Sequence, residues 1–222
     1  MGANHVQNWT GVAVSSTSPV VLSGTAITIG NWVVAGIRVP SGTTITPPSP
    51  FVLVTTEDNG TSKLETFAGK ATAADTSYSF SHDNVAATAK LGVLSEFVSI
   101  LDGAAVDVFA DTQTASGTSC STGTTGTTAQ ADEMAIAFVT FPGGAVTGTA
   151  CATGFTLGAE ATSGSIRLQL AWKVLTATGT QAGSWSWTTS RTSISAIFTL
   201  KGLAAGGIAP LADHHYRMQR AA

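Results

Sequence analysis

The chain has 222 residues, of which 43% are hydrophobic and only 10% are charged. Ten Lys and Arg against thirteen Asp and Glu give a net charge of −3, which argues against binding to nucleic acid or to an anionic membrane surface. Helices of soluble proteins usually expose faces rich in Lys, Glu and Arg, so this composition, with its many Ser and Thr, favours strands over an all-helical fold.

The predicted strands of the first half begin with an opening tract at 17–30 that holds a plausible strand pair, VVLSGTAITIG. Apolar or alternating runs bounded by turn residues then follow, which is the pattern of short strands. They are WVVAGIRVPSG (32–42), PFVLVTTEDNGTSKLE (50–65), TSYSFS (76–81) and KLGVLSEFVSIL (90–101).

Two stretches of the first half require closer attention to their residue patterns. Leu64, Thr66 and Ala68 alternate with the residues between them, which predicts a strand with one buried face. Residues 85–94 are the only helix-like stretch. Their counterpart in the second half, 188–195, is rich in Thr and β-branched residues, so we expect strand in both places.

The second half repeats the order of the first. Four pairs define the match, and they predict a tandem duplication: Pro40 with Pro142, Phe51 with Phe155, Leu64 with Leu168, and Phe97 with Phe198. The corresponding strands are MAIAFVTFPGG (134–144), GFTLGAEATSGSIRLQ (154–169), GSWSWT (183–188) and RTSISAIFTLKGL (191–203).

The region between the halves, 111–130, has the composition of a flexible linker. Because 17–30 stands at the corresponding place ahead of the first half, we expect 111–130 to hold opening strands of the second copy. The predicted division is therefore a first repeat at 1–102, a second at 103–203 and a C-terminal arm at 204–222. Each repeat fits an all-β, two-sheet antiparallel β-sandwich, for which jelly-roll and immunoglobulin-like topologies are both open.

The succession of a Ser/Thr/Gly tract, the strand DEMAIA (132–137), a Thr-rich hairpin, an aromatic strand such as 184–187 and a closing apolar strand at 194–200 resembles a β-sandwich module of tailed-bacteriophage virion proteins. The resemblance covers 18–203 and implies two tandem jelly-roll-like sandwiches. It also implies a non-enzymatic structural component of the virion, such as a minor tail, fibre-base or capsid-decoration protein, that assembles through sandwich faces and termini.

The partners that this resemblance implies are other virion proteins and further copies of the chain in a homo-oligomer. The expected location is the virion, after synthesis in the host cytoplasm. The N-terminus MGANHVQNWTG carries no export signal, and no run approaches the ~18 apolar residues of a membrane-spanning helix, so we expect no membrane partner.

An alternative function is recognition of a host-surface glycan through exposed aromatic side chains, for which Trp172 and Trp32 are the candidates. Another aromatic set occupies matching places in the two halves, which favours a role as core filling over a sugar platform. This set is Tyr78, Phe80, Trp185 and Trp187.

No catalytic motif is present, and Ser81-His82-Asp83 are neighbours in one strand, whose side chains alternate between faces. Asp107 and Asp111 lack the dense spacing of a calcium loop. We therefore expect no enzyme, no metal and no cofactor. Cys120 and Cys151 are expected to be reduced; because both lie in the second half, a disulfide between them is the alternative.

The C-terminal arm combines apolar side chains with imidazole and guanidinium groups. This mixture predicts an assembly contact on a neighbouring subunit, against the alternatives of a metal or acidic-partner site and of a free polar end. The residues concerned are Leu211, His214, His215, Tyr216, Arg217, Met218 and Arg220.

Overall fold

The structure is a computed structural model that describes residues 3–13, 19–84, 86, 88–141, 150–151 and 154–203. These residues form fourteen β-strands and no helix, and the strands pair antiparallel in two sheets. The all-β class predicted from composition and alternation is confirmed. None of the described residues lies in a helix that could cross a membrane. The predicted turn after Pro142 and the C-terminal arm lie outside the described residues.

The first sheet is built by the first half of the chain in the order β4-β7-β2-β1-β8-β3-β6-β5. Its edge strands are therefore β4 and β5. The strands are β1 (Asn4–Ala13), β2 (Val20–Ser23), β3 (Trp32–Pro40), β4 (Ile45–Thr46), β5 (Val52–Asp58), β6 (Ser62–Lys70), β7 (Ser77–His82) and β8 (Lys90–Val98).

The second sheet is built by the second half in the order β11-β14-β10-β13-β12, with β9 also paired to β14. The expectation of strands rather than a linker at 111–130 is confirmed only as far as Ser121, where β9 ends, because 122–130 hold no strand. The strands are β9 (Val106–Ser121), β10 (Met134–Phe141), β11 (Ala150–Cys151), β12 (Thr156–Ser163), β13 (Ile166–Val174) and β14 (Ser184–Leu200).

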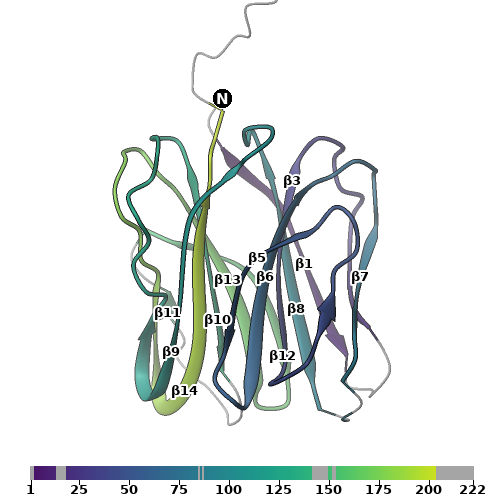
Figure 1. The fold of residues 1–222 in the computed structure, drawn as a ribbon, viewed down its shortest axis with the longest axis vertical. Helices are drawn as coiled ribbons and strands as arrows, with labels where there is room; N and C mark the ends of the chain where they lie inside the picture. The colour runs from purple at the N-terminus through teal and green to yellow at the C-terminus, as the bar shows by residue number, and fades with distance from the viewer. Residues whose placement is uncertain are drawn as a thin grey trace, which may run out of the picture.

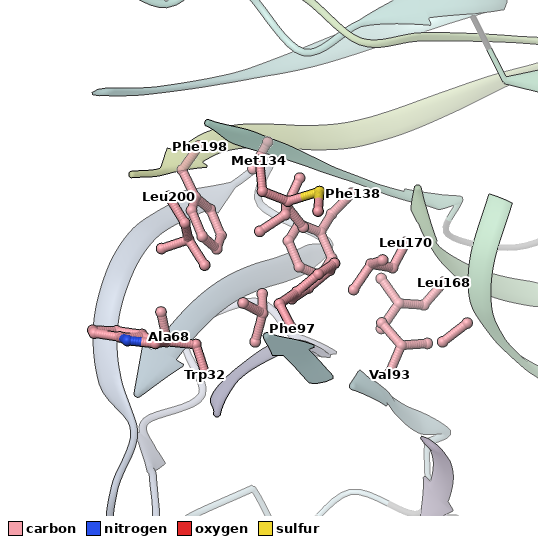
Figure 2. Close-up of a cluster of buried hydrophobic side chains, with 14 of the residues drawn as sticks. Trp32, Ala68, Val93, Phe97, Met134, Phe138, Leu168, Leu170, Phe198 and Leu200 are labelled. Carbon is pink, nitrogen blue, oxygen red and sulfur yellow. The ribbon is translucent and has the colours of Figure 1, made fainter. Parts of the chain in front are cut away.

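The two sheets pack face to face, the first on the right and the second on the left of Figure 1. The central core fills the space between them. Figure 2 shows Trp32, Phe97 and Val93 of the first sheet facing Phe198 and Met134 of the second. Because one continuous cluster of buried side chains joins both halves, the molecule has a core that neither half builds alone.

Each sheet also buries its other face. The first sheet curls until β7, the neighbour of the edge strand β4, lies over β6 and the start of β5, with the rings of Phe51 and Tyr78 5.0 Å apart and those of Phe67 and Phe80 5.3 Å apart. In the second half the Phe141 ring meets that of Trp187 at 4.5 Å, beside buried aliphatic side chains of the same sheet. The prediction that the aromatic strands are core is confirmed.

Burial on both faces corrects one expectation. In β6, Leu64 faces the central core, while Phe67 faces the inner core of the first half, and both are buried. The prediction of a single buried face was wrong, because β6 lies between two layers. The same position explains β3 and β10, in which Trp32–Val39 and Met134–Phe141 are buried without a break.

The strand neighbours follow one order in both halves, β1-β8-β3-β6-β5 and β9-β14-β10-β13-β12. Leu64 pairs with Arg38 and Leu168 with Thr140, and these partners stand equally far before Pro40 and Pro142. The register does not support the fourth pair: Phe97 lies opposite Trp32, whose counterpart Met134 lies opposite Leu200 instead of Phe198. The duplication itself stays a prediction.

Candidate functional site: an apolar groove between two edge strands

An apolar groove of about 480 Å³ lies between β5 and β6 on one side and the start of β9 on the other. We call it the β5/β9 groove. It lies where one edge of the first sheet meets β9 of the second, at the side of the central core. Its lining residues are Trp32, Pro50, Val52, Leu53, Val54, Ala68, Gly69, Lys70, Gly103, Ala104, Ala105, Val106 and Phe109.

The groove forms because β5 is the last strand of its sheet. Val52 pairs with Ala68 of β6, so both point to the face that carries the central core, yet Val52 is 68% exposed. Across the groove, Phe109 pairs with the buried Phe198 but is itself 55% exposed. Apolar side chains thus continue the core to the surface.

A close backbone approach shapes one end of the groove. A Cβ added at Gly69 would lie 2.3 Å from the carbonyl oxygen of Pro50, so only glycine lets these two segments pass. Trp32 lies on the central-core side of the groove with 9% of its surface exposed, and its indole N–H has no hydrogen-bond partner among the described residues. The groove therefore offers apolar surface and a buried donor, the Trp32 indole N–H, for which the described ranges supply no acceptor.

Charged groups stand only toward the two ends of the groove. At one end the Lys70 Nζ lies 2.6 Å from an Asp102 carboxylate oxygen, in an exposed pair that contributes little. At the other end Thr55 donates a hydrogen bond to Asp111. Burial raises the pKa of the nearby Glu57, and a hydrogen bond and repulsion from Asp111 raise it further.

The two candidate tryptophans do not come together. Trp32 is in β3 at the β5/β9 groove, and Trp172 is in β13, partly buried against the central core. The His5 ring stacks on Trp172 with 5.2 Å between centroids and 10° between planes, so one face of that indole is covered. His5 is held by Asn8, with 2.9 Å between Nε2 and Oδ1. The proposed arm residues lie beyond the described part of the chain.

The acidic residues singled out in the sequence have structural partners. Asp83 accepts a hydrogen bond from the Thr44 amide at 2.8 Å, and hydrogen bonding to Thr44 lowers the pKa of Asp83. Burial pushes the pKa of Asp107 upward, but bonds from the Ala129 amide at 2.6 Å and from Lys201 at 3.0 Å outweigh it and leave that pKa lowered. No three His, Cys, Asp or Glu of the described ranges are grouped to hold a metal ion.

The carboxylate of Glu96 in β8 is fully buried. It accepts hydrogen bonds from the Thr28 amide at 2.9 Å, from the Asn31 side chain at 2.6 Å and from the Gln7 side chain at 2.5 Å. Three donors compensate for its burial. They tie the turn before β3 to β1 and β8, which is a structural role.

The two cysteines flank one residue. Cys120 in β9 and Cys151 in β11 both pair with Trp185 of β14, from opposite sides. Strands two apart are separated by about 10 Å, beyond the ~7 Å over which a disulfide can form. Neither forms a disulfide, as expected, and burial raises the pKa of Cys120.

Apart from Trp32, the sequence did not point to the groove residues. Val52 and Phe109 lie far apart in the chain, and from sequence alone a single apolar residue in a strand is predicted to be buried in the core. The only available signal was the unbroken Val52-Leu53-Val54, which departs from alternation in an edge strand. Comparisons with protein-family models, with curated proteins and with solved structures found no match to this chain.

Proposed function

We propose that the chain is a structural subunit of a tailed-phage virion, of the minor tail, fibre-base or capsid-decoration kind. In this role it contacts other virion proteins and further copies of itself. The resemblance of its strand series to sandwich modules of such virions is the first support. The observation that carries the proposal is the set of large apolar side chains left exposed on strands at both flanks of the sandwich.

These residues are Val52 and Leu53 on β5, Phe109 on β9 and Leu157 on β12. Monomeric proteins seldom gather exposed apolar groups at sheet edges, because such edges pair with other chains. The low charge of the chain fits the same purpose, since few charges must lose water when a contact forms.

The body that carries these flanks is suited to permanent assembly. The central core joins both sheets, and the inner cores brace each sheet from behind. A structural subunit must hold its contact surfaces in fixed relation, and a sandwich buried on both faces of its main strands does so.

Electron microscopy can test the location. Phage particles that encode the chain are labelled with gold-conjugated antibody against it, and preimmune antibody serves as the control. We expect gold at one defined position on head or tail. Particles that stay unlabelled, and that lack the chain by mass spectrometry after purification, would refute the proposal.

The contact surface can be tested separately on the β12 flank. Leu157 is 48% exposed and Thr156 is its exposed neighbour. We expect Leu157→Asp to weaken self-association in sedimentation equilibrium, because it removes apolar surface. Thr156→Asp adds the same charge to the same strand and is the matched control. Equal association of both variants and the natural chain would exclude this flank as the contact.

A further inference from the structure

We propose that the C-terminal segment 204–222 occupies the β5/β9 groove of its own subunit. The proposal goes beyond the virion role and does not depend on it, because it concerns the free subunit and leaves the β12 flank with Leu157 exposed for assembly. It gives the exposed apolar groove a definite occupant, and it differs from the docking on a neighbouring subunit that the sequence alone suggested.

The first argument is where the described chain ends. The Leu203 amide donates a hydrogen bond to the Ser99 carbonyl and the Lys201 amide donates one to the Ala105 carbonyl, both at 2.8 Å. Residues 103–106 line the groove. The chain therefore leaves the sandwich beside one end of the groove.

The second argument is length. Nineteen residues follow Leu203, and even a partly extended segment of this size spans more than the roughly 23 Å of the seven-residue strand β5. The segment begins Ala-Ala-Gly-Gly, and the pair Gly206-Gly207 permits the chain to reverse toward the groove. Reach and direction both allow the segment to enter the groove.

The third argument is the order of chemical groups along the segment. Ile208 and Leu211 come first, after the glycines, and match the apolar end of the groove around Val52 and Phe109. Arg217 follows further on, and the far end of β5 and β9 carries the carboxylates of Glu57, Asp58 and Asp111. A backbone carbonyl of the segment can also accept a hydrogen bond from the Trp32 indole N–H, which has no acceptor within the described part of the chain.

The tether decides between the chain's own segment and that of another copy. A segment joined to the groove by a few residues is present at an effective concentration in the millimolar range. A separate copy at micromolar concentration would need a far tighter contact to compete. The geometry therefore favours the intramolecular contact in the free subunit.

Hydrogen exchange of the full chain, followed by mass spectrometry, tests the contact. In the natural chain we expect amides between Ile208 and Tyr216 to exchange at least tenfold more slowly than an unstructured peptide of the same sequence. Val52→Asp and Phe109→Asp should each return these amides to the unprotected rate. Both residues are more than half exposed, so the fold should survive, which circular dichroism checks.

The matched control is Val12→Asp in β1. Val12 is 48% exposed, and β1 is separated from β5 by three strands of the same sheet. This variant carries the same charge away from the groove and should keep the protection. Protection should also be unchanged on hundredfold dilution.

Three results would overturn the proposal. The first is that the segment of the natural chain exchanges at the unprotected rate. The second is that Val12→Asp removes the protection as fully as the groove variants do. The third is that the protection disappears on dilution. The last result would instead assign the groove to the segment of a second copy. None of these outcomes bears on whether the chain is found in phage particles, so the two proposals fail separately.

Discussion

A single added methyl group at Gly36 would test how tightly the two sheets meet. Gly36 lies in the middle of β3, and a Cβ built there would stand 2.5 Å from the Phe138 ring of β10, in the opposite sheet. Optimal carbon contacts are about 3.5 to 4.0 Å, so Gly36→Ala overlaps the ring by about 1 Å. Phe138 has no exposed surface and stacks with Phe198 at 6.1 Å between centroids.

The ring is rigid and enclosed, so the sheets must separate or the ring must leave its preferred rotamer. Overpacking of this kind costs about 1 to 3 kcal/mol. The replacement of glycine also restricts the unfolded chain, which offsets about 0.4 to 1 kcal/mol. We therefore expect a net loss of about 1 to 2 kcal/mol, or a fall in Tm of roughly 2 to 8 °C for a domain of this size.

Urea unfolding followed by tryptophan fluorescence measures the loss. Gly126→Ala is the matched control, because a Cβ there meets only Val108, at an ordinary 3.5 Å. A second control, Phe138→Leu, removes the ring. In that background Gly36→Ala should cost much less, which appears as a coupling energy in the double-mutant cycle. Equal stability of the Gly36→Ala and Gly126→Ala variants, or zero coupling to Phe138, would refute the packing that we describe.

Three further expectations concern the core, pH and the thiols. Phe97→Ala should cost about 3 to 5 kcal/mol in the same assay, because Phe97 is fully buried; a shift no larger than that of Thr10→Ala on the exposed side of β1 would contradict this. The pKa of Glu57 is raised in the folded state, so the folded protein holds the Glu57 proton more tightly than the unfolded chain does. As pH rises through that pKa, the ionised carboxylate weakens the contact between β5 and β9. Glu57→Gln should therefore be more stable than the natural chain at pH 7, with the difference vanishing below about pH 4.5; an unchanged difference across this range would exclude the mechanism. Thiol titration of the non-reduced, denatured chain should find two reduced thiols, those of Cys120 and Cys151, and a disulfide between them would contradict the separation of β9 and β11 by β14.

Local chemistry was enough to predict most of the strands, but β1 (Asn4–Ala13) was not predicted, and of the strand pair expected at 17–30 the described residues 19–30 form only β2 (Val20–Ser23). Alternation in Ser184–Trp187 and the Asp58-Asn59-Gly60 turn act within a few residues, and the structure has strands and a hairpin there. The burial of both faces of β6 was not predicted, and the reason is physical. Leu64 and Phe67 are both apolar, but alternation cannot distinguish a half-exposed strand from one that lies between two layers.

Register and surface depend on contacts between distant segments. The pairing of Phe97 with Phe198 relied on residue type, whereas backbone hydrogen bonds place Leu200 at the corresponding position. The β5/β9 groove depends on how far one edge strand stands from a strand of the other sheet. No pattern within Val52–Asp58 or Val106–Ser121 carries that information.

The shared core sets how far the two halves can be regarded as separate modules. The chain passes from one sheet to the other between Val98 and Val106, close to the predicted division at 102. Yet Trp32 and Phe97 of the first half pack against Met134 and Phe198 of the second, and all four are buried. A half released from its neighbour would present these rings to water. Contacts of this apolar, enclosed kind are typical of a domain core cut in two and not of independent modules. If a duplication produced the chain, the two copies now share one core, and the β12 flank outside that core is a surface left for assembly.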